Sequence, residues 1–284
     1  MRSVAVVGAG TMGHGIAQVS ALAGFDTTLV DVSEELVDDG LARIRANLDK
    51  GVARGKVDAA ARTAALANLS GSTDADAAAA AADVVVEAVP ERFDLKSGLL
   101  ERLAAAAPPT AIIATNTSSL SVTDLQRRTG APGRVVGLHF FNPVHIMALV
   151  EVVRGADTDE SVVDAAATWA RALGKEPIVV VDAPGFASSR LGIVLGLEAM
   201  RMLEQGVASA ADIDKAMELG YRHPMGPLRL TDLVGLDVRL DIARYLHERL
   251  GSEAFRPPAI LERMVADGRL GKKSGQGFYD WSEA

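Results

Sequence analysis

The chain of 284 residues is longer than one compact core usually requires, so its length predicts two domains. Its formal net charge of −8 argues against nucleic acid as a partner, because nucleic-acid binding calls for a basic face. The absence of Cys excludes disulfides, thiolate nucleophiles and Cys-ligated metals, and fits a cytoplasmic protein.

We expect neither a leader peptide nor a membrane segment. Strand-like residues begin at Val4, which leaves no room for a signal sequence. The longest uncharged apolar run of the second half, residues 191–197, is far shorter than the ~20 residues of a membrane helix.

The first 31 residues carry a dinucleotide-binding pattern. An apolar strand, residues 4–7, leads into Gly8-Ala9-Gly10-Thr11-Met12-Gly13, and apolar residues then recur with helical spacing. Gly8 permits a tight turn, Gly10 lets the backbone approach a pyrophosphate, and Gly13 allows the helix to pack closely on the strand. The phosphates would lie at the helix N-terminus, where free N–H groups favour negative charge.

Asp31, about 20 positions further on, predicts which cofactor is bound. Its carboxylate would accept a hydrogen bond from a ribose 2′-OH and repel a 2′-phosphate, so NAD is favoured over NADP. Asp31 could also be the N-cap of the next helix. His14, inside the loop region, is expected only to lie beside the pyrophosphate.

Strands and helices alternate as far as residue 181. Further strands are predicted at 83–89, 111–114, 135–138, 149–153 and 178–181, with helices at 34–56, 75–82, 93–107 and 161–173. This alternation indicates an α/β fold with a Rossmann-like, doubly wound sheet.

After the break at Asp182-Ala183-Pro184-Gly185 the pattern is helical, at 186–205, 209–219, 236–250 and 258–266. The sequence thus predicts a nucleotide-binding domain at 1–183 and an all-helical domain at 184–284. The first helix of the second domain is more apolar than one domain contact needs, which suggests a homodimer.

Polar residues follow the ends of the predicted strands. Glu91, Asn116, Ser118 and His139 each come directly after a strand, and parallel strands present such ends to one crevice. Ser118 or Ser119 could instead cap the next helix.

His139 and Glu151 lie at equal distances from residue 145, so a hairpin bend there makes them cross-strand neighbours. Their Cβ atoms would then be roughly 4.5–5.5 Å apart. A His held by a buried carboxylate is the general acid/base that alcohol–ketone chemistry needs, although a core histidine is the plain alternative.

Residues 43–62 carry six basic residues against two acidic ones. On an acidic protein this segment could receive a phosphorylated substrate tail. It could equally be a solvated helix face with pairs such as Arg45–Asp49.

These motifs, taken together, resemble the L-3-hydroxyacyl-CoA dehydrogenases, most closely the bacterial members acting on 3-hydroxybutyryl-CoA. The resemblance spans nearly the whole chain and comprises the glycine loop and residues 86–91, 95–96, 116–120, 137–143, 149–152, 184–186, 224–227 and 271–279.

The resemblance implies NAD as cofactor, an acyl-CoA as substrate and no metal. It implies that His139 is the catalytic acid/base, that Glu151 orients it, and that Ser118 and Ser189 contact the reacting oxygen. The remaining implied contacts are Gly8, Gly10, Thr11, Met12, Gly13, Asp31, Glu91, Lys96, Ser118, Asn142 and Lys273 for the cofactor, and Asn47, Arg54 and Ser118 for CoA.

Three positions depart from the family pattern. Ser189 stands where the family usually has Asn, His145 where Pro is common, and Ala148 where Lys is common. The expected reaction is the oxidation of a short-chain 3-hydroxyacyl-CoA. The alternatives are the same chemistry on a carrier-protein-bound or non-CoA hydroxy acid, and a non-catalytic NAD-binding scaffold.

Overall fold

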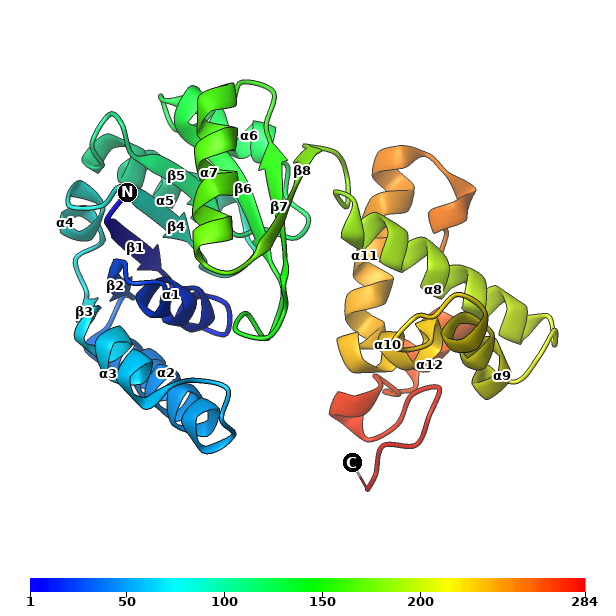
Figure 1. Ribbon diagram of the computed structural model, residues 1–284. Helices are drawn as coiled ribbons and strands as arrows, with labels where there is room; N and C mark the ends of the chain where they lie inside the picture. The colour runs from blue at the N-terminus through cyan, green and yellow to red at the C-terminus, as the bar shows by residue number, and fades with distance from the viewer. Residues whose placement is uncertain (284) are drawn as a thin grey trace. The chain divides into compact units, whose positions relative to one another are not determined.

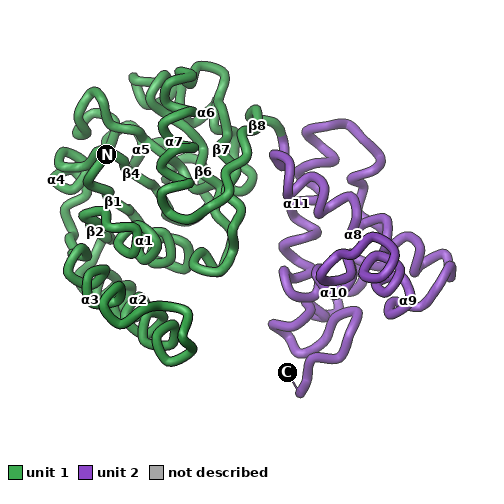
Figure 2. The backbone as a smooth tube through the Cα atoms, viewed as in Figure 1, with its two compact units in different colours: residues 1–183 green, residues 184–284 purple. Residues whose placement is uncertain are grey.

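A computed structural model describes residues 1–283. The chain divides into two compact units, residues 1–183 and residues 184–284, which Figure 2 shows in different colours. The division falls at the Asp182–Gly185 break in the strand–helix alternation.

The first unit is built on one eight-stranded sheet with the order β3-β2-β1-β4-β5-β6-β7-β8 (Figure 1). β7 is antiparallel to β6, and the remaining neighbours pair in parallel. The strands are β1 (Ser3–Val7), β2 (Asp26–Val30), β3 (Leu69–Ser72), β4 (Val84–Glu87), β5 (Ile112–Thr115), β6 (Val135–Phe140), β7 (Leu149–Arg154) and β8 (Glu176–Val181). The predicted Rossmann-like, doubly wound α/β fold is confirmed.

Helices cover both faces of this sheet because successive residues of a buried strand point to opposite faces. Val4 and Val6 pack into the core of one face, and Ala5 and Val7 into the core of the other. The first face is covered by α1 (Gly13–Leu22), α2 (Glu34–Ala53), α3 (Ala59–Ala67) and α7 (Glu160–Ala172), and the second by α4 (Ala75–Ala80), α5 (Phe93–Ala106) and α6 (Val122–Gln126).

Side-chain caps fix where these helices begin, and two of them correct the sequence analysis. Ser33 caps α2 by accepting a hydrogen bond from the Leu36 N–H, so Asp31 is not the cap. Ser121 caps α6, so neither Ser118 nor Ser119 does.

Several elements differ from the prediction. β3 was missed because Leu69-Ser70-Gly71-Ser72 has no β-branched residue and little apolar character. α3 was not predicted, because the predicted long helix ended at residue 56. Asp49 pairs with Arg62 of α3, at 2.5 Å, and not with Arg45.

The second unit is helical. Its elements are α8 (Ser188–Glu204), α9 (Ala210–Lys215), a single π-helical turn (Ala216–Gly220), α10 (Pro227–Val234), α11 (Leu236–Leu250) and α12 (Ala259–Ala266), with short 3₁₀ turns at Glu253–Phe255 and Lys272–Ser274. α10 was not predicted. The core is formed by Ile193, Leu197, Leu240, Leu246 and their neighbours. Within residues 1–283, no helix is both long and apolar enough to cross a bilayer.

Candidate active site

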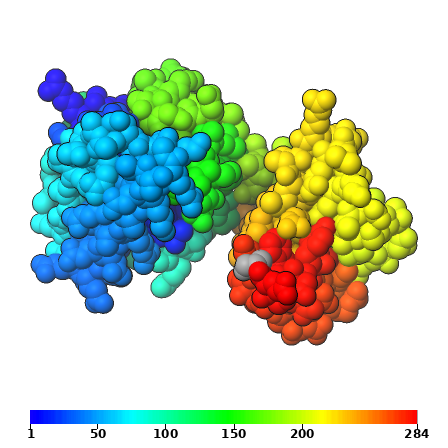
Figure 3. All heavy atoms as spheres, turned by 60° about the horizontal axis from the view of Figure 1, so that its bottom comes forward, coloured from blue at the N-terminus to red at the C-terminus, as the bar shows by residue number. Residues whose placement is uncertain are grey.

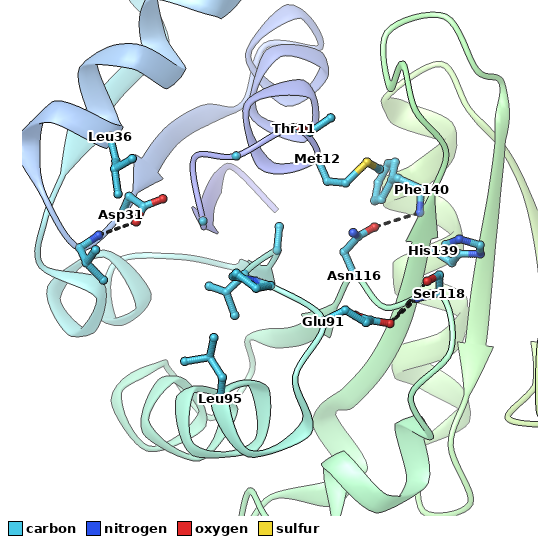
Figure 4. A pocket seen from close by; sticks show the side chains of 16 residues that line it. Thr11, Met12, Asp31, Leu36, Glu91, Leu95, Asn116, Ser118, His139 and Phe140 are labelled. Atoms are coloured by element: carbon cyan, nitrogen blue, oxygen red, sulfur yellow. Dashed lines mark hydrogen bonds between the residues drawn. The ribbon is translucent and has the colours of Figure 1, made fainter. Parts of the chain in front are cut away.

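A pocket of about 710 Å³ lies at the carboxyl ends of the first unit's parallel strands (Figure 4). We call it the nucleotide pocket. Its lining comprises Gly8, Gly10, Thr11, Met12, Asp31, Val32, Leu36, Ala88, Val89, Pro90, Glu91, Leu95, Asn116, Ser118, His139 and Phe140. The crevice expected from the strand ends therefore exists, and it contains Glu91, Asn116, Ser118 and His139 together.

The glycine loop has the geometry of an anion-binding turn. A Cβ on Gly13 would lie 1.6 Å from the Gly8 carbonyl oxygen, so the start of α1 packs directly on the loop. A Cβ on Gly10 would meet nothing within 4 Å, which leaves that face of the loop open toward the pocket. No side chain caps the N-terminus of α1 and no acidic residue lies in its first turn, so this end of the helix suits an anion such as a pyrophosphate.

Asp31 closes the other end of the pocket and also holds the loop. Its Oδ2 accepts a hydrogen bond from the Ala9 N–H, and its Oδ1 accepts one from the Val32 N–H, both at 2.7 Å. In Figure 4, Asp31 and Leu36 lie on one side of the pocket, while Asn116, Ser118 and His139 lie on the other. The two ends are thus suited to the two halves of a dinucleotide.

His139 and Glu151 are directly opposite residues of β6 and β7, as the hairpin prediction requires. The His139 Nδ1 lies 2.7 Å from Glu151 Oε2. The Glu151 side chain is fully buried, and that of His139 is 9% exposed where it lines the pocket. Because the carboxylate holds Nδ1, proton exchange with a ligand would take place at Nε2.

Glu91 organises the segment after β5 that carries Ser118. Its Oε1 accepts hydrogen bonds from Thr117 Oγ1 at 2.5 Å, the Ser118 N–H at 3.0 Å and Ser119 Oγ at 3.2 Å. Burial raises the pKa of Glu91, but the Lys96 ammonium and these hydrogen bonds outweigh it, so the pKa is lowered. Glu91 is therefore a carboxylate that fixes Ser118 at the pocket wall.

Lys96 lies behind that wall, fully buried on α5, and does not line the pocket. Its Nζ is 2.7 Å from Glu87 Oε1, 3.4 Å from Glu91 Oε2 and 3.0 Å from the Asn116 carbonyl oxygen. Glu87 also accepts hydrogen bonds from Thr115 Oγ1 and the Val89 N–H. Burial raises the pKa of Glu87, although Lys96 opposes this.

A second pocket, of about 770 Å³, belongs to the same unit and contains Asn47 and Arg54. We call it the basic pocket. In Figure 3 the atoms of α2, in blue, lie at the surface of the face shown. The lining also includes Gln18, Lys50, Lys56, His145 and Lys175, and none of the described lining residues is acidic. The six basic residues of 43–62 thus contribute three cations to one cavity, which favours the phosphate-binding interpretation over a plain solvated face.

Three expected site residues lie elsewhere. Asn142 is exposed after β6, joined by a cis peptide to Pro143, and lines neither pocket. Ser189 lies in the first turn of α8, and Lys273 pairs with Asp237 at 2.5 Å; both belong to the second unit. Within residues 1–283, no group of three His, Cys, Asp or Glu is placed to hold a metal ion.

The sequence analysis placed Asn116 at the crevice without naming its contacts, and it did not single out Glu87. Asn116 Oδ1 accepts a hydrogen bond from the Phe140 N–H at 3.1 Å, which ties the end of β5 to the end of β6. Glu87 anchors Lys96. The signal for Glu87 was available, because a Glu that ends a run of three Val residues in a buried strand needs a cationic partner.

Comparisons with known proteins place both units in one family. Residues 3–183 match the NAD-binding domain of 3-hydroxyacyl-CoA dehydrogenase, and residues 185–281 match the C-terminal domain of the same family. A 3-hydroxybutyryl-CoA dehydrogenase of Bradyrhizobium diazoefficiens is 42% identical, with 100% of this chain and 97% of that protein covered.

The likeness extends to solved structures. The (S)-3-hydroxybutyryl-CoA dehydrogenase of Ralstonia eutropha is 41% identical with a TM-score of 0.96, and 100% of each chain is covered. The mitochondrial hydroxyacyl-coenzyme A dehydrogenase of Sus scrofa is 40% identical, with 99% of this chain and 91% of that protein covered. With its cofactor NAD, this chain belongs to the 3-hydroxyacyl-CoA dehydrogenase family of oxidoreductases.

Proposed function

We propose that this enzyme catalyses the reversible, NAD-dependent oxidation of a short-chain (3S)-3-hydroxyacyl-CoA, 3-hydroxybutyryl-CoA in particular, to the 3-oxoacyl-CoA. The observation that carries the proposal is the His139–Glu151 pair, which opens onto the wall of the nucleotide pocket. Relatives about 42% identical over the full chain are 3-hydroxybutyryl-CoA dehydrogenases, which supports the substrate.

His139 acts as the general base in the oxidation. When bound, NAD supplies the hydride acceptor. With Nδ1–H donated to Glu151, the neutral imidazole presents the Nε2 lone pair and removes the proton of the 3-hydroxyl group. The buried Glu151 carboxylate keeps the ring in this tautomer and stabilises the imidazolium that forms. In the reverse direction the imidazolium returns the proton to the alcohol oxygen.

Ser118 and Ser189 contact the oxygen at C3. Glu91 accepts a hydrogen bond from the Ser118 N–H and so holds the Ser118 backbone. The Ser118 Oγ lies 3.5 Å from Glu91 Oε1 and beside His139 in the pocket (Figure 4). Ser189 is assigned by its position in the family motif. Its hydroxyl is shorter than the usual Asn side chain but still donates a hydrogen bond.

The remaining implied residues bind the two ligands. The glycine loop and Asp31 hold NAD, and we assign Asn142 and Lys273 to its nicotinamide side on the family motif. Lys96 acts on the cofactor through Glu91 and Asn116 because its own ammonium group is buried. Asn47 and Arg54 in the basic pocket bind CoA, whose phosphates match the cationic lining.

We also propose that the protein forms a homodimer through its second unit. We place it in the cytoplasm, because a chain without Cys does not depend on disulfide bonds. Leu191 and Leu195 of α8 are 62% and 42% exposed, and Leu230, Leu233 and Val234 of α10 and Val238 of α11 are also exposed. Light scattering should give twice the chain mass, and Leu191→Glu should shift it toward the monomer.

One assay tests the proposed reaction against the alternatives. NADH oxidation is measured with acetoacetyl-CoA, acetoacetyl-carrier protein and free acetoacetate, and repeated with NADPH. We expect acetoacetyl-CoA with NADH to give the highest kcat/KM. A higher kcat/KM with the carrier protein or the free acid would show that the substrate is not an acyl-CoA. Inactivity with all three would favour the non-catalytic NAD-binding scaffold.

A further inference from the structure

The connection between β6 and β7 is fixed to its surroundings on both sides of His145. A Cβ on Gly15 would lie 2.8 Å from the Cβ of Val144, so the connection packs directly on α1. Lys175, which follows α7 and is buried, donates from Nζ to the carbonyl oxygens of Val144 and of Met147, the latter at 2.9 Å. His145 is therefore presented by a backbone held at its neighbours.

His145 lines the basic pocket, and the charges that act on it are positive. His14 of α1 and Lys175 both act on its imidazole electrostatically. Lys50 of α2, with Arg54 and Lys56 after it, lines the same pocket, and no described Asp or Glu does. An imidazole in this position has no carboxylate that stabilises its charged form, so only a ligand can supply the missing negative charge.

Resting on the proposed function, we propose that His145 is a specificity-determining residue that recognises a phosphate group of CoA. It does so as an imidazolium and thereby favours acyl-CoA over the same acyl group on a carrier without phosphates. The assignment concerns a residue that lies outside the glycine loop and the nucleotide pocket.

The protonation of His145 then depends on the ligand. Burial first, and then the charges of Lys175 and His14, lower the pKa of His145 in the free enzyme. A bound phosphate favours the charged form and raises the pKa again. Binding of CoA is consequently coupled to proton uptake, and the contribution of His145 to affinity increases as the pH falls from 8 to 6.

The test compares acetoacetyl-CoA with acetoacetyl-pantetheine, which lacks the phosphates, for wild type, His145→Asn and His145→Pro. We expect both variants to lower the kcat/KM ratio of the two substrates by about 3- to 10-fold, through KM and not kcat. Arg128→Ala, which removes an exposed cation that lines neither pocket, controls for the general loss of positive charge. His145→Asn keeps the backbone free of proline if His145→Pro unfolds.

A binding measurement separates this proposal from the proposed function. Calorimetric titration with CoA, and with dephospho-CoA, should show weaker binding to His145→Asn than to wild type, and a difference that grows from pH 8 to pH 6. Equal CoA affinities, or equal substrate ratios, in wild type and His145→Asn would overturn the role of His145. Inactive wild-type enzyme that binds CoA through His145 would overturn the proposed reaction alone.

Discussion

His139 Nδ1 and Glu151 Oε2 lie 2.7 Å apart across two antiparallel strands, in a hairpin whose two strands are buried in the sheet. The strand register sets this contact, so a change in either side chain leaves the backbone around the other in place. The pair can therefore be tested by substitution without rebuilding the fold.

Replacing His139 by Ala should lower kcat by about 10²- to 10⁴-fold, because the proton of the 3-hydroxyl group then has no positioned acceptor. NADH affinity, measured by fluorescence titration, should change little, since the glycine loop and Asp31 are untouched. His247→Ala, at the end of α11, is the matched histidine control and should retain full turnover. Retained turnover in His139→Ala would remove the catalytic assignment.

Replacing Glu151 by Gln should lower kcat by more than it changes NADH affinity. The amide can still hold the ring but does not stabilise an imidazolium. The measurement is the pH–rate profile of the oxidation, which should change when the negative charge beside His139 is removed. A profile that superimposes on that of wild type would argue that the carboxylate has no electrostatic role.

Two glycines of the nucleotide loop should respond differently to alanine. Gly13→Ala places a methyl group 1.6 Å from the Gly8 carbonyl oxygen, so it should lower the free energy of unfolding by about 1–3 kcal/mol or prevent folding. Gly10→Ala meets nothing within 4 Å and should leave the melting temperature unchanged. Its methyl group faces the pocket, so NADH affinity should fall at least ~10-fold. Normal NADH binding by Gly10→Ala would mean that the pyrophosphate lies elsewhere.

Glu91→Gln should release the segment around Ser118 and leave Lys96 with one carboxylate fewer. We expect a lower kcat and a higher KM for NADH, with Arg102→Ala as a charge-changing control on α5.

The pH dependence of stability tests the same residue. Since the folded-state pKa of Glu91 lies below its unfolded value of 4.5, its contribution is present above that value and is lost as the pH falls through the folded pKa. Glu87 has the opposite effect on stability. Burial raises its pKa in the folded protein, so its contribution to stability is lost as the pH rises through that pKa. Urea unfolding of Glu91→Gln should therefore show less acid destabilisation than wild type below pH 5. Identical pH curves would show that Glu91 does not stabilise the fold.

Local sequence patterns were sufficient for the glycine loop and, apart from β3 and α3, for the strand–helix order of the first unit. Each rests on chemistry that acts within a few residues, such as apolar runs in buried strands and glycines where a side chain does not fit. The His139–Glu151 contact was also predicted, because the two residues lie at equal distances from the centre of the connection between β6 and β7. β3 and α10 were missed, since packing against neighbouring elements determines them more than their own composition does.

The sequence by itself determined that a dinucleotide loop, a His–Glu hairpin and a basic helix occur in one chain. Only the tertiary structure decided that Lys96 is buried behind Glu91, that Asp31 holds the glycine loop while Ser33 caps α2, and that His145 faces Lys175 and His14. These relationships join residues from separate elements. Their geometry depends on how strands and helices pack, which no local spacing along the chain specifies.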